Sequence, residues 1–330
     1  MLSRTADHLY WMARYIERAE NMARVLDVTY NMSLVPNAAV SEAALWKPAL
    51  EISGNIEAYT ESYGECTAAN VIHYLAMDAN NSSSIYNALR SARENARAVR
   101  VAMTSETWEN INALWLEFEQ FIGIDLAKGH LREFCDWVKA RSHLFRGVCF
   151  GTMLRDDAFS FVRLGSFIER ADNTARLLDV KYHLLLPDQE EIGGAVDYYE
   201  WSSVLRSVSA FQAYQKIFRD TIVPWRVAEL LVLRADMPRS LRACFDEISS
   251  ILSSLAGSRN LGGSSGSASS LGANECRRLA GELHSLLLYG KMEAIFQNGL
   301  HEFLTVFIRA NNNLSAEIQR AFLKPPVSEG

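Results

Sequence analysis

The sequence has little proline, no long apolar run and fewer basic than acidic residues. Only 7 of 330 residues are proline, so long stretches are free of the residue that most disrupts helices. Lys and Arg number 33 against 39 Asp and Glu, a net charge of −6. That balance argues against a broad nucleic-acid-binding surface. The one arginine cluster is typical of a solvated or partner-facing helix; it comprises Arg90, Arg93, Arg97 and Arg100.

No stretch has the length of a membrane span, and the first residues lack the apolar segment of a signal peptide. A cytoplasmic protein without membrane contact is therefore expected. The five cysteines are scattered without zinc spacing, which is typical of small core residues in a reducing compartment.

Nothing in the sequence matches a known cofactor or metal motif. Phosphate-binding glycine loops and the common hydrolase motifs are missing. A di-iron bundle needs Glu-x-x-His pairs, but the residue three after Glu17 is Glu20. His8 and His143 are interpreted as surface or hydrogen-bonded side chains. We expect neither a cofactor nor a metal.

What the sequence does contain is a repeat. Residues 16–30 (IERAENMARVLDVTY) and 168–182 (IERADNTARLLDVKY) are identical at eleven of fifteen positions, 152 residues apart. Weaker matches follow in the same order at offsets of 155, 156 and 169, as in Leu75 with Leu231 and Phe134 with Phe303. The sequence thus predicts an internal duplication, with one repeat at 1–152 and another at 153–330. We expect the two repeats to form one compact unit with a shared core.

Apolar residues recur with helical spacing in both repeats, which predicts an all-α, multi-helix bundle with two pseudo-equivalent halves. The two long helices are expected at 3–33 and 154–185. The jump in offset falls at 257–272, whose Gly and Ser content predicts a mobile surface loop. Ten further helices are expected at 42–62, 66–78, 83–102, 105–121, 130–150, 197–219, 222–234, 239–255, 275–289 and 292–323.

Polar residues that match in both repeats are the candidate site, since packing alone does not explain them. They are Glu17, Arg18, Asn21, Arg24 and Asp27, which recur as Glu169, Arg170, Asn173, Arg176 and Asp179. If the long helices pack around a pseudo-twofold axis, both sets meet in one polar seam. Two interpretations stay open: a buried structural ion-pair network, or a pocket in which Arg24 and Arg176 bind a carboxylate or phosphate.

A weaker candidate precedes the second long helix. Asp156 and Asp157, after Arg155, suit the positive end of the helix dipole. The alternative is a Mg²⁺ site that bound phosphates help to complete. We favour capping.

The repeated I-E-R-A-[ED]-N-x-A-R-x-L-D-V string resembles the alpha-E family, bacterial all-helical proteins with a characteristic Glu-Arg motif. The segment from Phe145 to Asp172 also resembles the family's central signature, and the resemblance covers essentially the whole chain. Two departures are the segment 77–84, which lacks an Asn-Pro-x-Ser turn, and the Gly/Ser insertion.

The resemblance implies partners rather than a reaction. Members are encoded beside, or fused to, a circularly permuted ATP-grasp protein, often with a transglutaminase-like protein nearby. Peptide ligation or modification is therefore the implied context. The leading hypothesis is a non-catalytic helical partner, or substrate-presenting component, of an ATP-grasp ligase. The alternative is an enzyme or small-ligand binder that uses the doubled Glu/Asn/Arg stripe.

Overall fold

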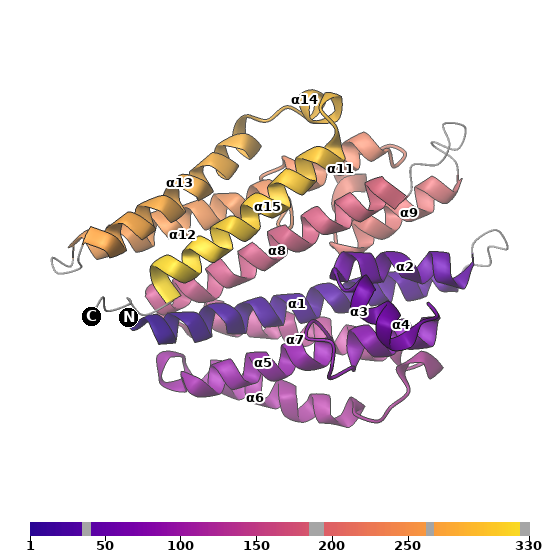
Figure 1. Ribbon diagram of the computed structural model, residues 1–330, viewed down its shortest axis with the longest axis horizontal. Helices are drawn as coiled ribbons and strands as arrows, with labels where there is room; N and C mark the ends of the chain where they lie inside the picture. The colour runs from indigo at the N-terminus through magenta and orange to yellow at the C-terminus, as the bar shows by residue number, and fades with distance from the viewer. Residues whose placement is uncertain (35–40, 185–194, 262–266, 324–330) are drawn as a thin grey trace.

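The computed structural model describes residues 1–34, 41–184, 195–261 and 267–323, and within these ranges the chain is all-α, without a strand. Two long helices, α1 (Ser3–Ser33) and α8 (Asp157–Leu184), lie side by side through the middle of the molecule (Figure 1). Both agree closely with the predicted long helices. The other helices divide into two groups, one beside α1 and one beside α8.

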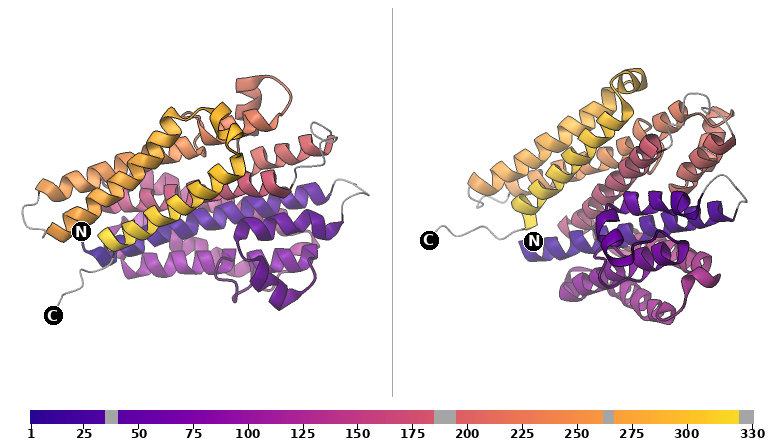
Figure 2. Two further views of the ribbon diagram at one scale, coloured as in Figure 1. Left: turned by 45° about the horizontal axis from the view of Figure 1, so that its top comes forward. Right: turned by 45° about the vertical axis from the view of Figure 1, so that its right-hand side comes forward.

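Most of the first group packs on α1 and most of the second on α8, while α2 and α9 each contact both central helices. α5 and α7 contact α1, and α6 joins them; α12 and α15 contact α8, and α13 joins them. The two views of Figure 2 show the groups on opposite sides of the central pair. The first group is α2 (Glu42–Ser53), α3 (Ile56–Tyr63), α4 (Ala68–Ala76), α5 (Ile85–Ala98), α6 (Ser105–Phe118) and α7 (Leu131–Thr152). The second is α9 (Ala195–Ser207), α10 (Phe211–Phe218), α11 (Pro224–Val232), α12 (Leu241–Leu261), α13 (Ser267–Tyr289), α14 (Met292–Gln297) and α15 (Leu300–Ile318).

The order of contacts is therefore the same in both groups, as the predicted duplication requires. The duplication itself and the division at 152/153 stay predictions, which superposition of the two halves tests. The buried apolar side chains of both groups form one continuous cluster.

α1 and α8 approach most closely at a glycine. A Cβ atom on Gly165 of α8 would lie 2.3 Å from the backbone oxygen of Tyr10 on α1 and 3.4 Å from the Cβ of Ala13. Ala13 occupies the position 152 residues before Gly165, so the crossing point uses small residues from matching positions. The glutamates of the two repeated motifs, Glu17 and Glu169, lie one turn beyond this crossing.

Three expected helices are each divided in two. The expected helix 42–62 breaks at Gly54, which ends α2 with φ of 72°. The helix expected at 197–219 breaks before α10, near Ser209 with φ of 56°, and that at 292–323 breaks at Gly299 with φ of 92°. A left-handed residue cannot continue a right-handed helix, which explains each break.

The predicted loop at 257–272 is wrong for most of its length. α12 continues to Leu261 and α13 already begins at Ser267; residues 262–266 lie outside the described ranges. Gly272 is closely packed, since a Cβ there would lie 2.9 Å from the Cβ of Ala321. Composition indicated a loop, but packing of α12 against α13 overrides low helix propensity.

Serine and threonine side chains cap several helix starts. The side chain of Ser84 accepts a hydrogen bond from the Asn87 backbone at the start of α5, and Thr104 does the same for Thr107 in α6. Ser240 caps α12 in the same way, through the Ala243 backbone. None of the helices in the described ranges combines the length and apolar character that crossing a bilayer requires.

Candidate functional site

The repeated Glu-Arg pairs bind each other across the α1–α8 contact. Glu17 of α1 accepts two hydrogen bonds from Arg170 of α8, each 2.9 Å long. In return, Glu169 of α8 accepts from Arg18 of α1, at 2.5 Å from Nε and 3.0 Å from NH2. Each motif thus supplies the carboxylate for one bidentate pair and the guanidinium for the other, as the pseudo-twofold arrangement predicts.

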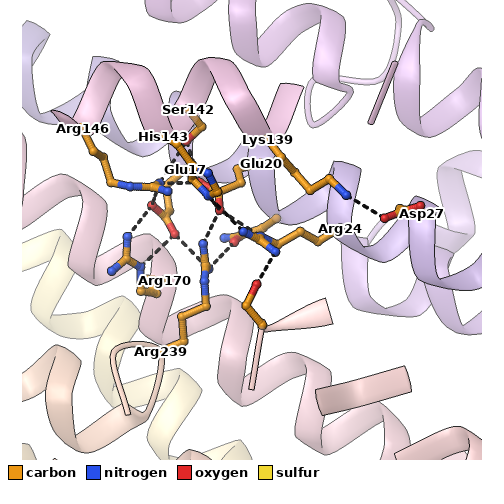
Figure 3. A network of polar contacts seen from close by, with 12 residues as sticks. Glu17, Glu20, Arg24, Asp27, Lys139, Ser142, His143, Arg146, Arg170 and Arg239 are labelled. Carbon is orange, nitrogen blue, oxygen red and sulfur yellow. Dashed lines mark hydrogen bonds and ion pairs between the residues drawn. The ribbon is translucent and has the colours of Figure 1, made fainter. Parts of the chain in front are cut away.

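The Glu17 side of this contact is filled with further cations, shown in Figure 3. Arg239, which precedes α12, donates to Glu17 at 3.1 Å and also to Glu20. Arg146 of α7 donates to the same two carboxylates. We call this the Glu17 network; its members are Glu17, Glu20, Arg24, Ser142, His143, Arg146, Arg170 and Arg239.

The rest of the network surrounds Glu20, whose side chain is fully buried. Arg24 donates to Glu20 from one turn away at 2.8 Å, and Ser142 donates at 2.6 Å. Arg24 also donates to Ser209 and lies 3.2 Å from His143, whose ring is about half exposed. Arg24 therefore takes part in the Glu17 network, and the cavity described below is lined by other residues.

Burial alone would raise the pKa of Glu17, but Arg170 and Arg239 outweigh burial and the pKa lies below its usual range. The pKa of Glu20 is also lowered, because His143, Arg239 and Arg146 outweigh its burial. Burial lowers the pKa of Arg239 in spite of both carboxylates. Positive charge is thus in excess here: four arginines surround two carboxylates.

The Glu169 side has a different set of partners. Arg14 of α1 donates to Glu169 at 2.8 Å and to Ser315 of α15 at 2.8 Å. Arg18 and Arg14 outweigh the burial of Glu169 and lower its pKa to about 2. One turn along α8, Asp172 accepts from Arg176 at 2.7 Å, as Glu20 does from Arg24. Burial nevertheless raises the pKa of Asp172.

A cavity of about 310 Å³ lies beside these residues, and we call it the Glu169 cavity. Its volume is at the lower end of the range for small-molecule sites. Charged and amide side chains dominate its wall. The lining residues are Arg14, Arg18, Asn21, Met22, Ile52, Ser53, Gly54, Ser83, Glu169, Asp172, Asn173, Arg176 and Asn312.

Residues at matching positions explain why one side is filled and the other is open. Ser84 and Ser240 lie 156 residues apart and both cap the next helix, α5 or α12. The residue before each is therefore matched as well: Ser83 on the cavity side and Arg239 in the network. Where Arg239 reaches two carboxylates, Ser83 has only a short hydroxyl and lines the cavity.

A second exchange has the same effect. At the offset of 169, Arg146 of α7 matches Ser315 of α15, and His143 matches Asn312. The buried positions of the two helices agree with this register, for example Phe145 with Leu314. Arg14 of α1 makes up for the missing arginine by donating to Glu169. Its matching residue on α8 is Ser166, which has no guanidinium group.

The outer pair of predicted site residues lies apart from both carboxylate clusters. Asp27 accepts from Lys139 at 2.7 Å and from Asn31. Asp179 bonds His301 at 2.6 Å. Asn173 lines the Glu169 cavity.

The Arg155–Asp157 segment acts as a helix start. Asp156 accepts from the backbone of Phe159 at 3.2 Å, which caps α8. Arg155 stacks on Phe150 and Phe159 at 4.0 and 4.1 Å. Asp157 is 43% exposed, and the described residues contain no group of three or more His, Cys, Asp or Glu arranged to hold a metal ion.

The four residues that the sequence did not single out are Arg14, Ser142, Arg146 and Arg239. Each lies outside the repeated string or differs between the repeats, so identity between repeats could not find it.

A larger, mainly apolar cavity of about 440 Å³ lies between α4 and the segment after α6, beside His73 and Tyr86. It shares no residue with the Glu-Arg contact.

The family comparison agrees with the repeated motif. A family described as Alpha-E, a predicted alpha-helical domain with a conserved ER motif, matches residues 1–323. No curated protein and no solved structure matches the chain.

Proposed function

The chain belongs to the Alpha-E family, and we propose that it is a non-catalytic binding component that holds a small anionic ligand in the Glu169 cavity. The observation that carries this proposal is the exchange of Arg239 for Ser83 at matching positions. On one side of the α1–α8 contact a guanidinium completes the charge network. On the other side the same place is open and is lined by side chains that recognise anions.

Charge supports an anion as the ligand. The residues of the two carboxylate clusters include seven arginines against Glu17, Glu20, Glu169 and Asp172, which leaves a net charge of +3. The whole chain has a net charge of −6, so the positive charge is concentrated here. Guanidinium groups match carboxylate and phosphate oxygens with paired hydrogen bonds.

Binding fits the cavity better than a reaction. Glu169 is held by two arginines, and the Ser53 hydroxyl donates to the Leu50 carbonyl. The remaining polar lining consists mainly of guanidinium and amide groups, which bind and orient a ligand.

The test restores the missing arginine. Ser83→Arg fills the cavity from the position where Arg239 fills the other side, and Ser82→Arg is the matched control, because Ser82 is exposed and does not line the cavity. Titration calorimetry with acetate, succinate and inorganic phosphate should show saturable binding of at least one anion to the unmodified chain and to Ser82→Arg. Ser83→Arg should weaken it at least tenfold. Equal binding by all three proteins, or no binding by the unmodified chain, contradicts the proposal.

A second candidate function is that of a partner of a circularly permuted ATP-grasp ligase, to which the chain presents the bound ligand, with a transglutaminase-like protein as a further partner. The family resemblance supports it. So does an exposed apolar cluster where α7 ends and α8 begins: Phe150 is 64% exposed and Leu154 is 78% exposed. Val101, between α5 and α6, is also exposed.

Co-expression with such a ligase tests this partnership. The double variant Phe150→Glu/Leu154→Glu should lose co-purification with the ligase. Leu286→Glu, on the exposed face of α13, is the control and should retain it. Co-purification that survives the double variant would place the contact elsewhere, and its absence with the unmodified chain would remove this candidate.

A further inference from the structure

Two residues that line the Glu169 cavity each carry one buried polar atom without a hydrogen-bond partner among the described residues: Nδ2 of Asn21 and Oδ1 of Asp172. Asn21 is 4% exposed. Its Oδ1 accepts from Arg239 at 3.0 Å, which fixes the amide orientation and leaves the NH₂ group as the free half. Asp172 uses Oδ2 for Arg176 and leaves Oδ1 free.

Buried polar groups are normally paired, because an unpaired one loses its hydrogen bonds to water without compensation. The two unpaired atoms are of opposite kinds: Asn21 offers a donor and Asp172 offers an acceptor. Asn21 and Asp172 come from different helices, α1 and α8, yet both residues line the same cavity. A ligand that satisfies both atoms must itself carry an acceptor and a donor.

The charges of the lining specify the acceptor. Arg14, Arg18 and Arg176 stand against Glu169 and Asp172, so a single anionic group balances the cavity. A carboxylate supplies that charge and accepts from Asn21. A simple carboxylate, however, brings only a further acceptor to Asp172 Oδ1 and leaves that oxygen unpaired.

We propose that the ligand is amino-acid-like, with a carboxylate for the arginines and Asn21 and an N–H group on the adjoining carbon for Asp172. This inference rests on the proposed function and narrows its ligand. Free amino acids and the carboxy-terminal residue of a peptide share this chemistry. Both present the carboxylate and the N–H in the same order, but only the peptide end adds a net negative charge at neutral pH, because the α-ammonium group of a free amino acid offsets its carboxylate.

Calorimetry with four probes separates the possibilities: L-alanine, N-acetyl-L-alanine, propionate and inorganic phosphate. At least one of the two N–H probes should bind at least tenfold more tightly than propionate, which lacks only the nitrogen. Preference for L-alanine indicates a free amino acid, and preference for N-acetyl-L-alanine indicates a peptide end. Either result supports the inference.

The variant Asp172→Asn sharpens the test. Its carbonyl oxygen stays on Arg176, so an NH₂ donor replaces the free acceptor and faces the ligand N–H. The preference over propionate should fall at least tenfold. Asp179→Asn is the matched control, because Asp179 lies on the same helix, bonds His301 and does not line the cavity.

Two results overturn the inference in distinguishable ways. If propionate or phosphate binds as tightly as the N–H probes, and Ser83→Arg abolishes that binding, the amino-acid-like ligand is wrong while the proposed function stands. If none of these probes or the simple anions binds, both are wrong. The comparison of probes uses the unmodified chain, so it does not depend on how well a variant folds.

Discussion

Replacing Glu169 by glutamine should remove a large part of the stability of the α1–α8 contact. Glu169 is buried and accepts from Arg14 and Arg18, neither of which can release its proton. The change leaves the buried guanidinium group of Arg14 and the partly exposed guanidinium group of Arg18 facing a neutral amide. Removal of one partner from a buried ion pair typically costs about 3–5 kcal/mol.

The pKa of Glu169 gives an independent magnitude. It lies at about 2 in the folded protein, against an ordinary value of 4.5. Since each pKa unit corresponds to about 1.4 kcal/mol, the ionised group contributes about 3 kcal/mol at neutral pH. The two routes agree in size.

The pH dependence follows from the direction of this shift. A lowered folded-state pKa gives stability that is present above pH 4.5 and is lost as the pH falls towards 2. The difference in unfolding free energy between the unmodified chain and Glu169→Gln should therefore be about 3 kcal/mol at pH 7 and about 1.5 kcal/mol at pH 3. Urea unfolding followed by circular dichroism at both pH values measures it.

Glu282→Gln is the control, because Glu282 forms only an exposed pair with Arg278 and should leave the urea midpoint unchanged. A loss below about 1 kcal/mol for Glu169→Gln at pH 7 would refute the buried-pair reasoning, given the magnitudes above. So would a loss that is equal at pH 7 and pH 3.

Two further predictions concern the packing and the start of α8. Gly165→Ala should lower stability by about 1–3 kcal/mol in urea unfolding, since its Cβ would meet the Tyr10 carbonyl; Gly147→Ala, with open space around its Cβ, should not destabilise α7. Asp156→Ala should cost about 1 kcal/mol through loss of the cap, and Asp157→Ala should cost less. Equal losses of stability for Gly165→Ala and Gly147→Ala would contradict the close contact at Gly165, and equal losses for Asp156→Ala and Asp157→Ala would contradict the cap.

The fold was largely predictable where the helical pattern is long and unbroken. α1 ends within a residue of its expected bounds, and α8 begins at Asp157, close to the expected start. The points at which helices end were less predictable from the local sequence. Ser209 has a positive φ without being glycine, and no local pattern marks it. The loop predicted for the Gly/Ser segment was wrong because a distant contact overrides the local composition. Packing against Ala321 holds Gly272 within a helix.

The candidate site was predictable where its partners lie in the repeated string. Reciprocal pairing of Glu17 with Arg170 and of Glu169 with Arg18 follows from two identical motifs around an axis. Arg239 was not predictable, because it joins the cluster from 219 residues beyond Glu20 through the packing of α12 on α8. Asp27 shows the same limit, because its partner Lys139 lies 112 residues further along the chain.

The asymmetry of the site changes how identity between the repeats should be interpreted. Residues identical in both repeats, such as Glu17 and Glu169, make reciprocal ion pairs between α1 and α8. The difference between the two sides comes from matching positions that hold different residues, above all Arg239 against Ser83. A filled network stabilises the fold, whereas an open cavity with unpaired atoms on Asn21 and Asp172 costs stability. Such a cost is typical of a binding site, so we infer that the proposed ligand is admitted where the matching residues differ, while residues identical in both repeats, such as Arg18 and Asn21, help to bind it.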